Sequence, residues 1–139
     1  MRFTFRPMAI DDYEAAFALW EKTPGMVLNQ SDSQEAVRKF LGRNPGLSFV
    51  CFDGETLIGS VLCGHDGKRG FLYHAAVDED YRGSGIGREL ITRCLDGLKE
   101  EEIIRCYLFV LEDNELGSLY WERSGWTKRD GILLFSKDT

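Results

Sequence analysis

The chain has 139 residues, of which 43% are hydrophobic and 29% charged, proportions typical of one globular domain with a single core. Its net charge of −6 disfavours nucleic acid as a partner, because phosphate backbones are bound by clustered Lys and Arg. No apolar run approaches the roughly 18 residues that cross a bilayer, and the N-terminal residues do not resemble a signal peptide. We therefore expect a cytoplasmic protein without a membrane partner.

Hydrophobic periodicity predicts a mixed α/β protein. Alternating apolar residues between turn signals indicate strands, and apolar residues at spacings of three and four indicate helices. In chain order we expect a strand at 2–6, helices at 11–22 and 33–42, strands at 47–52, 57–64 and 71–77, a helix at 85–98, a strand at 103–111, a helix at 114–125, and a closing hairpin of strands 126–129 and 132–137. This order, βααβββαβαββ, predicts one domain over residues 1–139 with one central sheet.

Local signals set the expected ends of the first two helices. Asp11 and Glu14 have the spacing of a capping box, and Gly42 is a C-terminal stop signal. The irregular segment between the two helices is a candidate wall of an acceptor site. Met26 and Leu28 in that segment suit either the core or a pocket lining.

Isolated cysteines and histidines give no metal or redox motif. The chain has four cysteines without C-x-x-C spacing and two histidines, so neither a zinc site nor a redox pair is expected. The cysteines lie in apolar contexts typical of buried thiols: Cys51, Cys63, Cys94 and Cys106.

The most informative stretch is DEDYRGSGIGREL, which has glycine at 83, 85 and 87. It joins the strand ending near Val77 to the helix beginning near Gly85, so its amides crowd at a helix N-terminus and favour an anion. Arg82 and Arg88 would add positive charge at the rim. The residues do not match a P-loop, which needs Lys-Ser or Lys-Thr after the glycines. They also do not match the dinucleotide fingerprint G-x-G-x-x-G, because this loop has the spacing G-x-G-x-G. A flexible glycine-rich turn remains the alternative on this pattern alone.

The segment YRGSGIG after an apolar strand resembles the acetyl-coenzyme-A signature of the GNAT superfamily of N-acetyltransferases, [RQ]-x-x-G-x-[GA]. Arg82, Gly85 and Gly87 occupy its fixed positions. The order of elements is similar over nearly the whole chain, and NELGSLYWERSGW resembles the family's second cofactor motif. The resemblance implies a mostly antiparallel sheet, splayed between strands 71–77 and 103–111, with helices on both faces.

The resemblance also implies a reaction, in which acetyl-CoA is a co-substrate and no metal is required. The acetyl group would pass directly to a primary amine of a small molecule or a protein N-terminus, and the Val77 amide would stabilise the oxyanion. The resemblance assigns contacts with the coenzyme to Ala76, Val77, Arg82, Gly83, Ser84, Gly85, Ile86, Gly87, Arg88, Asn114 and Trp121.

The residues for proton transfer depart from the family pattern. Where the family often has a tyrosine acid, this chain has Trp121, whose indole is not a proton source near neutral pH. Trp121 is therefore expected to pack beside the thioester. Tyr120 is the neighbouring phenol, about 100° round the helix, and is the candidate acid that remains.

A carboxylate base is also missing. The places where family members tend to carry a glutamate correspond to Phe71 and Phe109. Strand alternation would put the odd-numbered residues of 71–77, including Tyr73, on one face and His74 on the other. Tyr73 is then the candidate to hold a water, and His74 is expected to be a core or edge histidine. Alternatively, the amine arrives neutral or loses its proton through water.

Two other functions stay open from the sequence. The pattern also suits a non-catalytic acetyl-CoA or CoA-binding regulatory module, since neither usual proton-transfer residue is present. A weaker alternative is a protein that uses the loop to bind the phosphate of another nucleotide.

Overall fold

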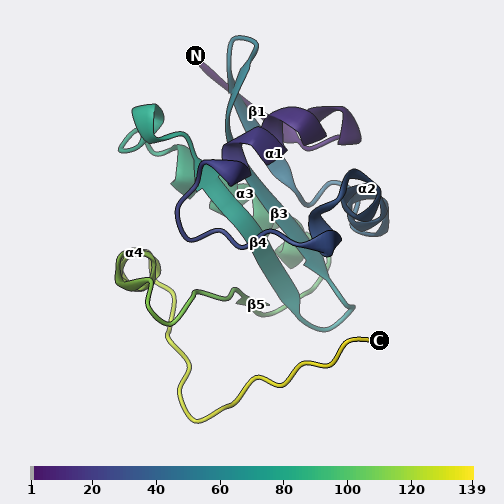
Figure 1. Ribbon diagram of the computed structural model, residues 1–139, viewed down its shortest axis with the longest axis vertical. Helices are drawn as coiled ribbons and strands as arrows, with labels where there is room; N and C mark the ends of the chain where they lie inside the picture. The colour runs from purple at the N-terminus through teal and green to yellow at the C-terminus, as the bar shows by residue number, and fades with distance from the viewer. Residues whose placement is uncertain (1) are drawn as a thin grey trace. The chain divides into compact units, whose positions relative to one another are not determined.

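The structure is a computed structural model that describes residues 2–139, and the chain divides into two compact units, Met1–Phe109 and Val110–Thr139. The first unit contains a five-stranded sheet with the strand order β1-β2-β3-β4-β5 (Figure 1). Its elements are β1 (Phe3–Pro7), η1 (Ile10–Asp12), α1 (Tyr13–Glu21), η2 (Gln30–Asp32), α2 (Gln34–Arg43), β2 (Phe49–Asp53), β3 (Thr56–His65), β4 (Gly70–Val77), η3 (Glu79–Tyr81), α3 (Ile86–Glu100) and β5 (Cys106–Tyr107). No helix within residues 2–139 is long and apolar enough to cross a membrane.

The sheet is antiparallel from β1 to β4, and β5 then joins it parallel to β4 after the crossover helix α3. The β4–β5 pairing covers only Gly70↔Cys106 and Phe71↔Tyr107. From Leu72 onward the outer edge of β4 has no strand partner in the described chain. The splay predicted between these two strands is confirmed, although the paired part of the second strand is shorter than the expected 103–111.

Helices cover both faces of the sheet, with α1 and α2 on one face and α3 on the other (Figure 1). On the α1 side, the fully buried indole of Trp20 donates from Nε1 to Ser60 Oγ at 2.9 Å. On the α3 side, Gly59 of β3 allows close packing, since a Cβ there would lie 3.1 Å from both Ile86 and Leu90.

An irregularity in β4 changes which side chains share a face. Ser60 pairs with Ala76 and Leu62 with Tyr73, so His74 and Ala75 oppose the single β3 residue between them as a β-bulge. His74 has a φ of 51°, in the left-handed region. Its ring contacts Trp20 on the α1 side, and Tyr73 packs against Phe40 of α2 on the same side of the sheet. The expectation that strand alternation separates Tyr73 from His74 is therefore wrong.

Two helix ends also differ from the local signals. The first α-helix follows Asp12, whose carboxylate accepts from the Ala9 amide at 2.9 Å and from both Arg6 guanidinium nitrogens at 2.8 Å. Asp11 is therefore not the capping residue, because it lies inside η1 and Asp12 occupies the N-cap position of α1. Gly42 lies inside α2, which continues to Arg43, since glycine weakens a helix without ending it.

The second unit contains helix α4 (Glu115–Arg123), within the range expected for a helix. It ends in a Schellman motif: Gly125 has a φ of 94°, and the amides of Gly125 and Trp126 donate to the carbonyls of Glu122 and Trp121. The hairpin expected at 126–137 is absent, because these residues form no strand. A two-stranded hairpin is only marginally stable without a third strand or a helix to pack on.

Candidate functional site

The glycine loop runs from the end of η3 into α3, and its backbone requires glycine. Gly83 and Gly85 both have a φ of 82°, a conformation that side-chain-bearing residues rarely adopt, and Gly85 is the N-cap of α3. A Cβ at either position would meet no atom within 4 Å. These glycines are therefore explained by backbone conformation, and they leave the surface of the loop open. The predicted start of the helix near Gly85 is confirmed.

Unpaired amides line this loop. The first hydrogen bond of α3 runs from the Glu89 amide to the Gly85 carbonyl at 3.1 Å, and the amides of residues 83–88 make no hydrogen bond within the described chain. Successive free N–H groups at the start of a 15-residue helix, together with its macrodipole, favour a bound anion. The local geometry therefore fits a phosphate group.

Two anchors hold the segment that leads into the loop. The Asp78 carboxylate accepts hydrogen bonds from Lys22 Nζ at 2.9 Å and from the Asp80 amide at 3.0 Å. Both lower the pKa of this carboxyl, and the bond from Lys22 has the larger effect. Tyr81 donates to Asp53 at 2.8 Å, which ties η3 to the end of β2. The loop therefore starts from a fixed point on the sheet.

The end of β4 presents its backbone to the open edge of the strand. The Asp78 amide donates to the Ile58 carbonyl at 2.8 Å. Along two antiparallel strands, residue pairs that exchange backbone hydrogen bonds alternate with pairs that do not. The neighbouring pair Gly59↔Val77 is therefore non-bonded, so the Val77 amide and carbonyl point away from β3. Arg82 Nε donates to that carbonyl at 3.3 Å. The Val77 amide is thus a free donor at the open edge of β4, a few residues from the loop.

A group of polar side chains lies beside this edge on the α1 side. His74 Nε2 is 2.6 Å from Asp32 Oδ1, and the His74 ring is 4.8 Å from the Trp20 ring, centroid to centroid. Asp32 is buried, and its Oδ2 accepts from the Asn29 amide at 3.0 Å. Partial burial raises the pKa of the Tyr73 phenol.

The role of Asp32 was not predicted from the sequence. Asn29 and Asp32 have the spacing of a capping box, and in the structure they cap η2 together. That local signal could have placed Asp32 at an ordered turn. Its partner His74 lies 42 residues away in the chain, so only the fold could reveal the pair.

The remaining predicted residues lie in the second unit. Asn114 caps α4, with its side-chain oxygen accepting from the Gly117 amide at 3.0 Å. Trp121 packs edge to face against both Tyr120 and Trp126, with centroid distances of 5.1 and 5.3 Å. The Trp121–Trp126 contact is the hydrophobic pair that accompanies a Schellman motif.

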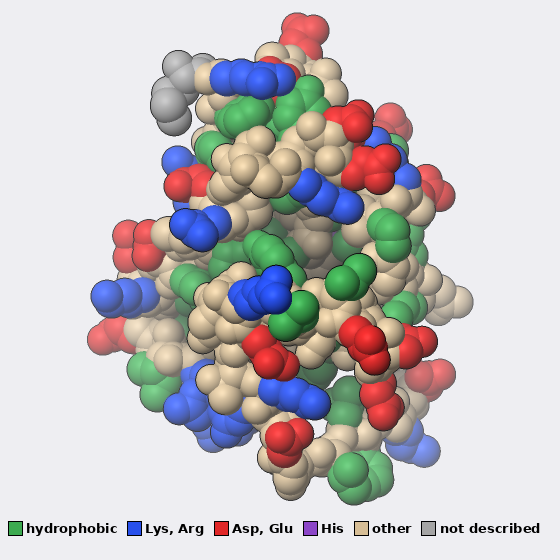
Figure 2. Space-filling model, turned by 90° about the vertical axis from the view of Figure 1, so that its left-hand side faces the viewer, with side chains coloured by type: hydrophobic (Ala, Val, Ile, Leu, Met, Phe, Trp, Pro, Cys, Tyr) green, Lys and Arg blue, Asp and Glu red, His purple; other side chains and the backbone are tan. Residues whose placement is uncertain are grey.

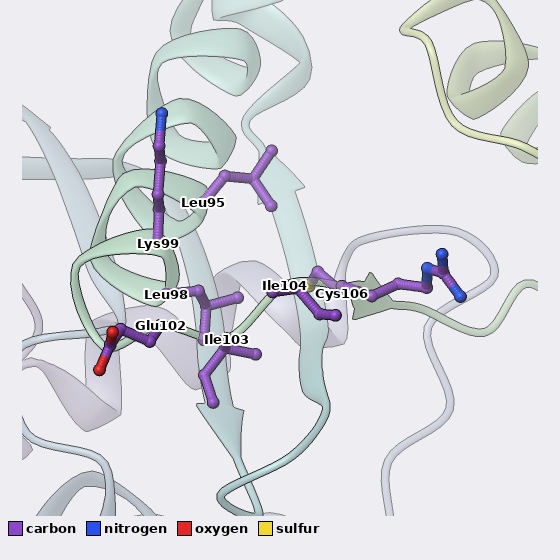
Figure 3. A pocket seen from close by; sticks show the side chains of 8 residues that line it. Leu95, Leu98, Lys99, Glu102, Ile103, Ile104 and Cys106 are labelled. Atoms are coloured by element: carbon purple, nitrogen blue, oxygen red, sulfur yellow. The ribbon is translucent and has the colours of Figure 1, made fainter.

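A surface cavity of about 400 Å³ lies away from these groups, at the C-terminal end of α3 (Figure 3). It is lined mainly by apolar side chains of α3 and of the segment leading to β5, including Leu95, Leu98, Ile103 and Ile104. The glycine loop is at the other end of this helix, so the cavity is separate from the candidate site.

The distribution of charged side chains bears on whether the described residues could bind nucleic acid or a metal ion. On the face shown in Figure 2, Lys and Arg side chains are interspersed with acidic ones. Within residues 2–139, no group of three or more His, Cys, Asp or Glu side chains is placed to hold a metal ion.

Comparisons with known proteins agree with this geometry. Residues 12–126 match the model of the Acetyltransferase (GNAT) family. The chain is 31% identical over 127 residues to acetyltransferase SG1711 of Sodalis glossinidius, covering 91% of this chain and 89% of that protein. It is 32% identical over 124 residues to acetyltransferase ECA0875 of Pectobacterium atrosepticum, covering 89% of this chain and 87% of that protein.

The fold is similar to that of PaiA N-acetyltransferase from Thermoplasma acidophilum, solved in complex with coenzyme A. The TM-score is 0.82 at 19% identity, covering 95% of this chain and 94% of that one. The family match spans the glycine loop, the open edge of β4 and α4. The chain therefore belongs to the acetyltransferase (GNAT) family and has the fold of an N-acetyltransferase.

Proposed function

We propose that the protein transfers an acetyl group from acetyl-CoA to a primary amine by direct attack in a ternary complex. One observation carries the proposal: the free amides at the start of α3 lie a few residues from the free Val77 amide at the open edge of β4. The first group suits the pyrophosphate of the coenzyme, and the second suits a thioester carbonyl. Both sites are formed by backbone.

The donor site would use three parts of the chain. The amides of the segment 82–88 would bind the pyrophosphate, with the Arg82 and Arg88 side chains adding charge at the rim. The backbone at Ala76 and Val77 would pair with the pantetheine arm in place of the missing strand neighbour. Asn114 and Trp121 of the second unit would contact the arm and the thioester.

The chemistry needs an oxyanion donor, a deprotonated amine and a proton for the leaving thiolate. The Val77 amide would donate to the carbonyl oxygen as the amine nitrogen attacks. Tyr73 would hold a water beside the amine, and Tyr120 is the proposed proton donor to the thiolate. The C–N bond forms, the C–S bond breaks, and the products are the acetylated amine and free coenzyme A.

The acceptor we propose is an amine-bearing small molecule or a protein N-terminus. The net charge of −6 suits a cationic acceptor and disfavours nucleic acid. The cysteines within the described chain are all free thiols, which agrees with a reducing compartment such as the cytoplasm.

An amine-panel assay tests the proposal. The purified protein is incubated with acetyl-CoA and polyamines, amino acid derivatives, aminoglycosides or N-terminal peptides, and acetylation is read by mass spectrometry. Gly85→Glu, which places a carboxylate among the phosphate-binding amides, should abolish turnover and weaken coenzyme binding by at least about 100-fold.

Gly46→Glu is the matched control. Gly46 also has a positive φ, 76°, and a Cβ there would meet no atom within 4 Å; it lies in the loop before β2, away from the glycine loop. Unchanged turnover in Gly85→Glu would show that the site is wrong. Tight coenzyme binding without turnover across the panel would instead indicate a binding module, and displacement of acetyl-CoA by NADH or ATP would indicate another ligand.

A further inference from the structure

The β-bulge in β4 places two consecutive polar residues on one face of the sheet. Tyr73 and His74 would face opposite sides of a regular strand, yet both pack against helices of the α1–α2 side. The left-handed backbone of His74, φ 51°, is uncommon for a residue with a side chain. Such strain tends to persist where the surrounding structure enforces it, and here Trp20 and Asp32 hold the ring.

The contacts of the ring indicate which nitrogen is free. His74 Nε2 lies 2.6 Å from Asp32 Oδ1, and a carboxylate can only accept, so Nε2 carries the proton. His74 Nδ1 makes no hydrogen bond within the described chain. Every buried polar side-chain atom in that part of the chain has a hydrogen-bond partner, so an atom without one, such as Nδ1, must be accessible to solvent. The neutral ring therefore presents its lone pair at Nδ1.

Asp32 is held in place from three directions. Its Oδ1 faces His74, its Oδ2 accepts from the Asn29 amide at 3.0 Å, and its carbonyl oxygen accepts from the Tyr13 hydroxyl at 2.6 Å. Within residues 2–139, no Lys or Arg side chain pairs with this buried carboxylate. The His74 ring is the side chain that pairs with the Asp32 carboxylate. The carboxylate orients this ring in the way that a carboxylate orients a catalytic histidine.

We propose that His74 is the proton acceptor for the acceptor amine, with Asp32 as its positioning residue. This inference rests on the proposed acetyl transfer. It gives the reaction the base that no carboxylate on β4 or β5 supplies. His74 lies three residues before Val77, a separation of about 10 Å along a strand. An amine placed against a thioester at Val77 would pass its proton to His74 through the water assigned to Tyr73, because about 10 Å exceeds the reach of one hydrogen bond.

The protons balance. The amine arrives as an ammonium ion, and His74 Nδ1 takes one proton, which leaves the nitrogen lone pair free to attack. The positive charge on the ring then lies against the Asp32 carboxylate. After the C–N bond forms and the C–S bond breaks, Tyr120 gives its proton to the leaving thiolate and is reprotonated by the second proton of the nitrogen, and His74 releases its proton to solvent.

Other titratable groups near the pair do not interfere at neutral pH. Burial, followed by the nearby Asp32 and Glu21 charges, raises the pKa of Tyr13, and burial raises the pKa of Tyr73. Both phenols therefore stay protonated between pH 6 and about 9. Asp32 is the charged group that contacts the ring.

The first test is nitrogen NMR of the intact protein labelled with 15N-histidine. The chain has only two histidines, so His65→Gln leaves His74 as the single signal. We expect the Nε2–H tautomer at high pH, and a mixture of tautomers in Asp32→Asn. A predominant Nδ1–H tautomer in the protein with Asp32 intact would overturn the proposal.

The second test compares His74→Gln with His65→Gln. His65 also pairs with a carboxylate, Glu101 at 2.7 Å, but it lies at the far end of β3, so it is a matched control. With the best amine from the panel, His74→Gln should lower kcat by about 100-fold at pH 7, with coenzyme binding unchanged. The loss should shrink at about pH 9.5, where more of the amine is already neutral.

Asp32→Asn should lower kcat by about 10-fold with little change in KM for the amine, because the ring stays present but loses its orientation. Equal activity of His74→Gln and His65→Gln would contradict the His74 assignment while the acetyl transfer stands. Absence of turnover by the unmodified protein would contradict the proposed function itself, and with it this inference.

Discussion

The indole of Trp20 and the hydroxyl of Ser60 form a hydrogen bond of 2.9 Å inside the core, and both side chains are fully buried. Trp20 also packs against His74, so the core of the α1 face extends to the His74–Asp32 pair. The bond ties α1 to the middle of β3. A change at Ser60 should therefore affect both stability and the environment of Trp20.

Ser60→Ala removes the acceptor and leaves the indole N–H buried without a partner. We expect the free energy of unfolding to fall by about 1–3 kcal/mol. Urea unfolding followed by tryptophan fluorescence measures this loss. The control is Ser124→Ala, whose exposed hydroxyl bonds the Tyr120 carbonyl and should cost less than about 0.5 kcal/mol. Equal effects of the two substitutions would contradict the prediction.

The Arg6–Asp12 pair predicts a dependence of stability on acid pH. Burial alone would raise the pKa of the Asp12 carboxyl, but hydrogen bonds from Arg6 and the Ala9 amide outweigh it and hold this pKa below its ordinary value of 3.8. A carboxyl with a lowered pKa stabilises the fold above its unfolded pKa, and this stabilisation is lost as the pH falls through the folded pKa.

Asp12→Asn should therefore lower the free energy of unfolding by about 1–3 kcal/mol at pH 7. The difference from the unmodified protein should diminish as the pH falls below about 4. Urea titrations across this pH range measure it. Asp11→Asn, at the exposed neighbour, should change the free energy of unfolding at pH 7 by less than about 0.5 kcal/mol; equal losses in both variants would argue against the role of the pair.

Two glycines should respond to alanine in opposite directions. Gly42 is exposed inside α2, and a Cβ there would meet no atom within 4 Å, so Gly42→Ala should stabilise the protein by about 0.5–1 kcal/mol. At Gly64 of β3 a Cβ would lie 2.6 Å from Asn44 Nδ2 and 2.7 Å from Phe40 Cζ. Gly64→Ala should therefore destabilise by about 1–3 kcal/mol, as thermal unfolding would show. A loss of stability in Gly42→Ala would contradict the assigned helix.

The cysteines should react slowly in the folded protein. Burial raises the pKa of Cys51 to about 11 and that of Cys106 to about 12. At pH 8, alkylation of these thiols by iodoacetamide, followed by mass spectrometry, should be more than about 100-fold slower than in 6 M guanidinium chloride. Labelling of Cys51 at the unfolded rate would show that the core around β2 is open.

Features that depend on neighbouring residues could be predicted from the sequence. The glycine spacing before an amphipathic run predicted the start of α3 at Gly85 and the crowded amides, because positive φ and unpaired N–H groups are properties of a short segment. The β2–β3 hairpin and the N-cap at Asn114 follow from equally local signals. The family match to residues 12–126 agrees with the resemblance in the two coenzyme motifs.

Features that depend on partners far along the chain required the tertiary structure. The bulge in β4 arises from its pairing with β3, and it reverses the side-chain alternation on which the expected place of His74 rested. Asp32 meets His74 across 42 residues, and no spacing rule predicts that contact. The hairpin expected at 126–137 was predicted from turn residues, and turn residues alone do not stabilise two strands. Local sequence determined the glycine loop and its unpaired amides, whereas strand pairing and packing decided that Asp32 and His74 meet.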